Sequence, residues 1–173
     1  MTRKFIAALP LAFSLAACST LAGPPAVAQD AVTPAADVDA LFTDPDPKLN
    51  ANKQAAWHIM KDLLEAGHWE LADKWMTERY IQHNPNVASG RQTVVDFFNG
   101  LGIEPKPIPE HLSTPVVQVV AEGDYVVVVS ASQQPVPGDP DKTYTTSWFD
   151  MWRFVDGKAD EHWDNATMTP KPE

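Results

Sequence analysis

The sequence is poor in cysteine, in basic residues and in long apolar runs. Its 173 residues include one cysteine, Cys18, so a disulfide within one chain is excluded. With 13 Lys and Arg against 23 Asp and Glu, the formal net charge is −10. Because phosphate binding requires clustered cations, this charge argues against a nucleic-acid partner, and it disfavours anionic membrane surfaces as well. The main apolar stretch, residues 5–17, is too short for a transmembrane helix.

That stretch is instead typical of an export signal, because Arg3 and Lys4 precede it. It ends in Leu-Ala-Ala-Cys, which resembles the bacterial lipobox, and the resemblance implies that residues 1–17 are removed and that Cys18 is lipidated. Cleavage there takes the side-chain charge from −10 to −12, since two cations leave. Cleavage after residues 26–28, Ala-Val-Ala, is the alternative. We therefore expect an exported lipoprotein on the periplasmic side of a bacterial envelope, held to the membrane only by lipid, or alternatively a periplasmic or secreted protein.

The remaining chain has the length of one domain. Residues 18–48 are rich in Ala, Pro and Asp without periodicity, which predicts a disordered tether. Leu41 and Phe42 are apolar enough to dock on the domain, but a solvated linker is the expectation. The folded domain is predicted over residues 49–168, with residues 169–173 as a tail.

Three helices are predicted first. One begins near Asn50 and is stopped by Gly67, because its apolar residues recur at steps of three and four. A short second helix covers residues 68–76, and Pro85 and Gly90 break the pattern after it. A third is predicted over residues 91–101, after Ser89 as a cap.

Strands follow. Two β-branched runs, residues 116–121 and 125–133, are joined by Glu-Gly-Asp, and residues 143–154 and 158–166 form a second hairpin about Val-Asp-Gly. Helices followed by an antiparallel meander indicate an α+β fold. The helices must cover one face of the sheet, and a curved sheet leaves a cavity between the two layers.

The turn of the second hairpin determines which side chains share a face. A three-residue loop with Gly157 in the left-handed conformation pairs Phe154 with Lys158, and Asp150 then lies opposite His162. A two-residue turn shifts every pair by one and separates Asp150 from His162. In the favoured register Trp148 is opposite Asp164 and Trp152 is opposite Asp160. One face then carries Trp148, Asp150, Trp152, Phe154, His162 and Asp164, and the other carries Phe149, Met151, Arg153, Glu161 and Trp163.

The first of these faces has the composition of a small-molecule pocket, since it sets three polar groups inside apolar walls. A carboxylate beside an imidazole can move a proton near neutral pH. Structural roles are the alternative: Asp164 as a cap at the strand end, and Asp150 and His162 as partners across the ladder. A metal set of His83, His162 and Asp150 lacks any short ligand motif, so a metal site is not expected.

These residues, with Tyr-Ile-Gln-His-Asn-Pro at 80–85, resemble the SnoaL-like polyketide cyclase family within the nuclear transport factor 2-like superfamily. The shared features include Gly90-Arg91 at the start of the third helix, the Glu-Gly-Asp hairpin, and a closing hairpin that ends in Glu-His-Trp-Asp at 161–164. The likeness covers about residues 49–168. It departs at Ala159 and Asp160, where the family has apolar residues.

The resemblance implies a cone-shaped α+β barrel with a pocket at its wide end, which acts without a cofactor. It implies acid–base roles for Asp164 and Asp150, with His162 in support. It places His83 where it can hydrogen-bond a substrate carbonyl or orient a carboxylate, although holding the turn is the alternative. Trp148, Trp152, Tyr80 and Phe154 complete the predicted substrate-binding set, of which Tyr80 also fits a loop-packing role.

Three functions remain open at this point. The first is an aldolase-, cyclase- or isomerase-type enzyme acting on a small apolar carbonyl compound. The second is a non-catalytic envelope protein that binds an apolar ligand or a protein partner. The third is a homodimer formed through the outer face of the sheet, where Phe149, Met151 and Trp163 are expected.

Overall fold

The folded part of the chain begins before the predicted start at Leu49. The computed structural model describes residues 30–169. The backbone N–H of Ala35 donates to the carbonyl of Val116 at 2.9 Å, and the short helix η1 (Asp39–Phe42) buries Phe42 completely. The prediction of a tether up to residue 48 is therefore wrong over this stretch, because Phe42 packs into the core. The proposed leader and Cys18 lie outside the described residues.

The first long helix begins three residues earlier than predicted. α1 (Pro47–His58) starts with Pro at its first position, and the Asp46 carboxylate accepts from the backbone N–H groups of Lys48 and Leu49 at 2.8 and 3.0 Å. It continues as the π-helix η2 (Ile59–Glu65). Gly67, at φ +79°, ends it as predicted, in a conformation that favours glycine.

The predicted second helix is shorter than expected and is followed by a strand. A turn of 3₁₀-helix, η3 (Trp69–Leu71), leads into α2 (Ala72–Trp75), and the chain then extends as β1 (Met76–Gln82). β1 was not predicted from the sequence. Its apolar residues do not alternate, because its register shifts between Met76 and Ile81 where it pairs in parallel with β5.

The remaining elements follow the prediction closely. The third helix, α3, spans Arg91–Asn99. The four later strands are β2 (Val116–Glu122), β3 (Tyr125–Val136), β4 (Asp139–Val155) and β5 (Lys158–Asp164). They form antiparallel pairs in sequence order, and β1 adds to the free edge of β5, which gives the sheet order β1-β5-β4-β3-β2.

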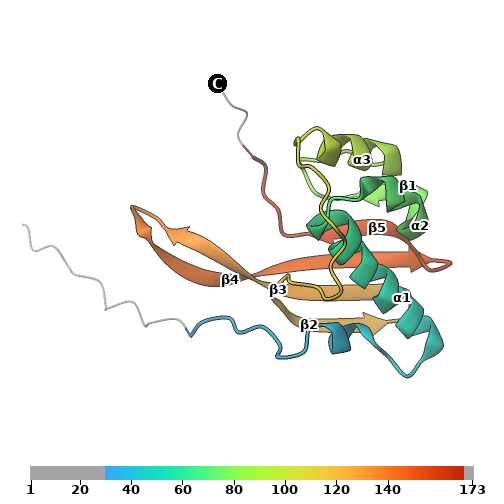
Figure 1. The fold of residues 1–173 in the computed structure, drawn as a ribbon, viewed down its shortest axis with the longest axis horizontal. Coiled ribbons are helices and arrows are strands. Elements are labelled where there is room, and N and C mark those ends of the chain that lie inside the picture. The colour runs from blue at the N-terminus through green and yellow to red at the C-terminus, as the bar shows by residue number, and fades with distance from the viewer. Residues whose placement is uncertain (1–29, 170–173) are drawn as a thin grey trace, which may run out of the picture. The chain divides into compact units, whose positions relative to one another are not determined.

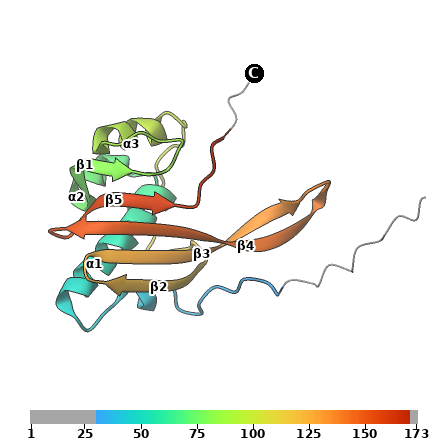
Figure 2. The same cartoon turned by 180° about the vertical axis from the view of Figure 1, so that it is seen from behind.

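The α+β class is confirmed, but the sheet is curved and open rather than closed into a barrel. Within residues 30–169 no ladder joins β1 to β2, the two edge strands. Figures 1 and 2 show α1 lying across one face of the sheet, and the opposite face is not covered by any helix of the described residues. The ribbon of β3 and β4 extends past the other strands in both views.

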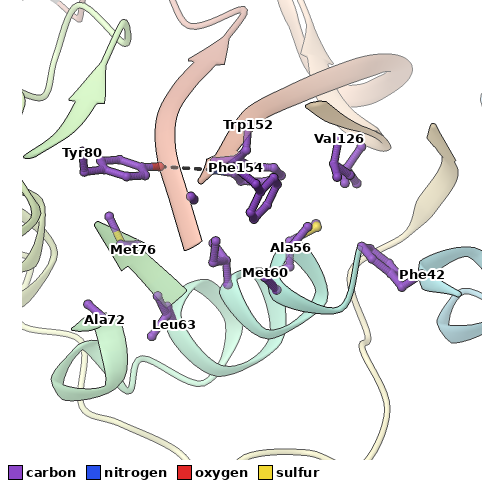
Figure 3. Packing of buried hydrophobic residues seen from close by; sticks show 14 of the residues in the cluster. Phe42, Ala56, Met60, Leu63, Ala72, Met76, Tyr80, Val126, Trp152 and Phe154 are labelled. Carbon is purple, nitrogen blue, oxygen red and sulfur yellow. Dashed lines mark hydrogen bonds between the residues drawn. The ribbon is translucent and has the colours of Figure 1, made fainter. Parts of the chain in front are cut away.

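The core lies between α1 and the sheet. Figure 3 shows Ala56 and Met60 of the helical layer facing Trp152 and Phe154 of β4. All four are at most 4% exposed, so this contact excludes water. Burying side chains of this size is the main stabilising term, at about 1.5–3 kcal/mol each. This packing holds β4 rigidly against the helical layer.

The second hairpin has a different register from the predicted one. Its loop has two residues, Asp156 at φ +49° and Gly157 at φ +73°, which is the pattern of a type I′ turn. Asp150 pairs with Asp164 and Trp152 with His162, not Asp150 with His162. The predicted three-residue loop was therefore wrong.

A β-bulge nevertheless preserves the predicted faces. Phe154 pairs with Ala159 and Arg153 with Glu161, which leaves Asp160 as an extra, unpaired residue. The two-residue turn moves the alternation of side chains by one position, and the bulge moves it by one more. As a result Asp150, His162 and Asp164 do point to the same side of the sheet.

Candidate functional site

A cavity of about 380 Å³ opens between the concave side of the sheet, α3 and the end of the helix η2. Its polar wall comes from β4, β5 and the end of β1: Gln82, Asn84, Asp150, His162 and Asp164. Its apolar wall includes Ile59, Leu64, Trp69, Met76, Tyr80, Val94, Phe97, Phe98, Trp148 and Trp152. Such a combination suits a small, mostly apolar ligand with a few polar atoms.

His162 and Asp150 form a buried pair in this cavity. The Nε2 atom of His162 lies 3.1 Å from Oδ1 of Asp150, and the two side chains are 9% and 13% exposed. On its other side, Nδ1 of His162 lies 2.8 Å from the side-chain oxygen of Gln82. The imidazole is therefore held at both nitrogens.

The hydrogen bonds fix the tautomer of His162. The backbone N–H of Asn84 donates to the same oxygen of Gln82, at 3.1 Å, so this amide must present its oxygen and not its NH₂ group. Nδ1 of His162 is consequently the donor to Gln82. A favourable contact between Nε2 and Asp150 then requires one proton between them, carried by either the imidazole or the carboxyl group. The pair can thus give or take one proton at the cavity wall.

Asp164 lies beside this pair, opposite Asp150 on the ladder. The side-chain NH₂ group of Asn84 donates to its Oδ2 at 2.7 Å, and the backbone N–H of Ala166 donates to its Oδ1 at 3.0 Å. Each carboxylate oxygen has a further lone pair. Asp164 is therefore oriented by two donors and can still accept from a ligand.

Tyr80 supplies a neutral donor to the same cavity. The indole N–H of Trp152 donates to its hydroxyl oxygen at 3.1 Å, which is the contact drawn in Figure 3, so the phenol proton remains available. Tyr80 is 4% exposed, and burial raises the pKa of its hydroxyl, with the charges of Asp150 and Asp164 adding to the effect. The phenol accordingly stays protonated and can donate a hydrogen bond.

Two residues of the predicted site lie elsewhere. His83 is outside the cavity: its Nε2 atom contacts Oε1 of Glu161 at 2.9 Å and its ring stacks on Trp163, with centroids 4.9 Å apart. Both partners belong to the outer face of the sheet. Phe154 belongs to the core, where it pairs with Ala159 and is 3% exposed. Neither residue lines the cavity.

Gln82 and Asn84 were missed by sequence reasoning. Gln82 ends the strand β1 and Asn84 follows it. The sequence did not predict this strand, and the partners of both residues on β5 lie 80 residues further along the chain. The only signal for them was their place around His83 in the Gln-His-Asn segment.

The three titratable groups could also hold a metal ion. Asp150, His162 and Asp164 each present one ligand atom, and these atoms lie within 4.8 Å of one another. Two carboxylates and one imidazole suit several divalent ions, and Gln82 already fixes the tautomer that leaves Nε2 free to bind one. The sequence had suggested His83 in place of Asp164 for such a set.

The family of the chain follows from a comparison with known protein families. The family model described as a SnoaL-like domain matches residues 58–162, which is more than half of the sequence, and the chain belongs to this family. None of the curated proteins matches the sequence. Among residues 30–169, no helix has the length and apolarity needed to cross a membrane.

Solved structures with related folds are similar at low sequence identity. A proposed SnoaL-like polyketide cyclase from Jannaschia sp. CCS1 is 18% identical with a TM-score of 0.49, covering 71% of this chain and 91% of its own. An NTF2-like protein of unknown function from Burkholderia pseudomallei is 14% identical with a TM-score of 0.46, covering 66% and 89%. TsrD from Streptomyces laurentii is 18% identical with a TM-score of 0.41, covering 70% and 90%.

Proposed function

We propose that the cavity transfers protons to and from a small, largely apolar carbonyl compound without a cofactor, in a reaction of the aldol, cyclase or isomerase type. The observation that carries this proposal is the convergence of Asp150, His162 and Asp164 on one wall of an otherwise apolar cavity of about 380 Å³. Membership in the SnoaL-like family supports it at the level of the fold alone.

In this proposal each group has a role. Asp164 takes a proton from the carbon next to the substrate carbonyl, and the electron pair of that C–H bond forms an enolate. The phenol of Tyr80, rather than the imidazole of His83, donates a hydrogen bond to the enolate oxygen as its charge develops. The shared proton of the Asp150–His162 pair neutralises the oxygen or carbon that receives the electron pair. Asp164 then releases its proton to solvent, and the pair takes one back from solvent, so each group recovers its starting state.

Proton exchange tests this assignment without knowledge of the natural substrate. The wild-type protein is expected to speed the exchange of the α-protons of 2-tetralone for deuterium in D₂O, followed by NMR. Asp164→Asn keeps the size of the side chain and one of its two accepting oxygens but removes the base, so exchange should fall by about 10²-fold or more. Asp141→Asn, at an exposed position of the β3–β4 ribbon, is the matched control. Equal rates for wild type and Asp164→Asn would refute the assignment.

Ligand binding without turnover is the second candidate function. It is favoured by the Asp150–His162 pair, which is satisfied internally by Gln82 and thus has no need of a substrate. Saturable binding of 2-tetralone with no exchange above the buffer rate would select this alternative.

Export and lipidation of Cys18 belong to the same proposal, supported by the sequence of residues 1–18. Labelling of expressing cells with a fatty-acid analogue should tag the wild-type chain and leave Cys18→Ala untagged. An untagged wild type that is shortened at residue 28 would instead indicate secretion after Ala-Val-Ala.

Association through the outer face of the sheet is also proposed. Val120, Tyr125 and Phe149 are exposed there at 55%, 42% and 46%. Light scattering should give the mass of a dimer for the wild type and of a monomer for Phe149→Glu. A monomeric wild type at high protein concentration contradicts this part of the proposal.

A further inference from the structure

A second cavity adjoins the first one. It has a volume of about 290 Å³ and shares three lining residues with the main cavity: Leu64, Trp148 and Asp150. The two spaces are therefore neighbours across the side chains of Trp148 and Asp150. Its other lining residues come from the helix η2, from the segment before β2, and from β3: Met60, Glu65, Thr114, Ser130, Ala131 and Ser132.

Most polar groups of the second cavity already have partners. Glu65 accepts hydrogen bonds from the backbone N–H groups and the hydroxyls of both Ser113 and Thr114, which together occupy the lone pairs of its carboxylate. The hydroxyl oxygen of Ser132 accepts from the side chain of Gln134 at 2.9 Å. These groups have little capacity left to select a ligand.

Ser130 is the exception. It is 6% exposed, and its hydroxyl has no hydrogen-bond partner among the described residues. Leaving a buried hydroxyl unpaired is unfavourable, so such a group calls for a partner from outside the chain. Ser130 lines the second cavity, and its hydroxyl has three staggered positions about χ1 to choose from.

We infer that the ligand of the main cavity extends past Asp150 into this second cavity and places an oxygen function against Ser130. Ser130 pairs with Trp148, and Asp150 pairs with Val128, so Ser130 and Asp150 are diagonal neighbours on one face of the sheet, about 7 Å apart. The substrate class is thereby narrowed to elongated, fused-ring or chain compounds with a hydroxyl or carbonyl oxygen at the end remote from the reacting carbonyl. The inference rests on one part of the proposed function, namely that the reacting carbonyl of the ligand lies in the main cavity.

Two related ketones test the second site. 2-Tetralone has one oxygen, and 6-hydroxy-2-tetralone carries a second oxygen at the far end of its fused rings. Calorimetric titration of the full chain should give about fivefold tighter binding of the hydroxylated compound, the factor supplied by one net hydrogen bond. Ser130→Ala should bind both compounds equally. Ser132→Ala, two residues along the same strand and in the same cavity, should keep the preference.

Each result bears on the inference. Three results overturn it. The wild type binds the two compounds equally, it binds neither of them, or Ser130→Ala still prefers the hydroxylated compound. Melting curves of the variants confirm that they are folded. Deuterium exchange separates this site from the proposed function: exchange without preference overturns the inference and leaves the proton-transfer function standing, whereas preference without exchange supports the inference and contradicts proton transfer.

Discussion

Replacing Asp160 by Asn is expected to destabilise the protein in a way that depends on pH. Asp160 is 4% exposed and accepts hydrogen bonds from Thr77, Arg79 and Arg153. The hydrogen bond from Arg79, first among these influences, lowers the pKa of Asp160 from 3.8 to about 2. Because the pKa is lower in the folded state, ionisation of this carboxyl group stabilises the fold above pH 3.8 and that stabilisation is lost as the pH falls through 2. This lowering of the pKa corresponds to a stabilisation of about 2 kcal/mol.

Urea unfolding of the wild type and Asp160→Asn at several pH values measures this contribution. The loss in free energy of unfolding should be about 2 kcal/mol from pH 7 to pH 5 and should shrink to about half near pH 3. Asp141→Asn, an exposed control, should change stability by less than about 0.5 kcal/mol. A loss for Asp160→Asn that is absent at pH 7, or that is the same at pH 7 and pH 3, would refute the assignment of the stabilisation to the ionised carboxylate.

Two further predictions concern the N-terminal segment and the polar cluster. Phe42→Ala should lower the free energy of unfolding by about 3–5 kcal/mol, because Phe42 is fully buried. Phe149→Ala, on the exposed face, is the control and should lower it by less than about 1 kcal/mol. Similar losses for the two variants in urea unfolding would contradict a packed N-terminal segment. Added Zn²⁺ should slow the exchange of 2-tetralone protons, because an ion bound by Asp150, His162 and Asp164 displaces the shared proton. Faster exchange with Zn²⁺ than after treatment with EDTA would show that the site uses a metal.

Local patterns in the sequence predicted most of the fold. The apolar stripe from Ala55 to Leu63 and the stop at Gly67 gave the first helix, and two β-branched runs around Gly123 gave the hairpin of β2 and β3. These elements depend on contacts between residues close in the chain. Their periodicity is therefore visible in the sequence itself.

Non-local contacts explain what the sequence did not reveal. β1 is a strand because it pairs with β5, and the bulge-like irregularity in that pairing removes any alternation. Phe42 is core because α1 and the sheet leave a site for it, although its neighbours have the composition of a linker. In both cases a distant partner determines the structure.

Two features of the second hairpin were not predicted, and their effects on the site cancel. The Asp156-Gly157 pair favours a two-residue turn, and the extra residue Asp160 is held out of the ladder by Arg79 and Arg153. Neither feature was predicted, but together they restore the alternation that brings Asp150 and His162 to one face. His83 does not contact the cavity as expected, because it lies beside β5 and its side chain contacts Glu161.

The most direct test of the central claim is an NMR titration with 2-tetralone that follows the side-chain signals of Asp150, Asp164 and His162. Nδ1 of His162 should remain protonated throughout, held by Gln82, and the signals of Nε2 and of both carboxyl groups should shift saturably with the ketone. An unprotonated Nδ1, or side-chain signals that do not respond to the ketone at any concentration, would contradict a proton-transfer site in this cavity.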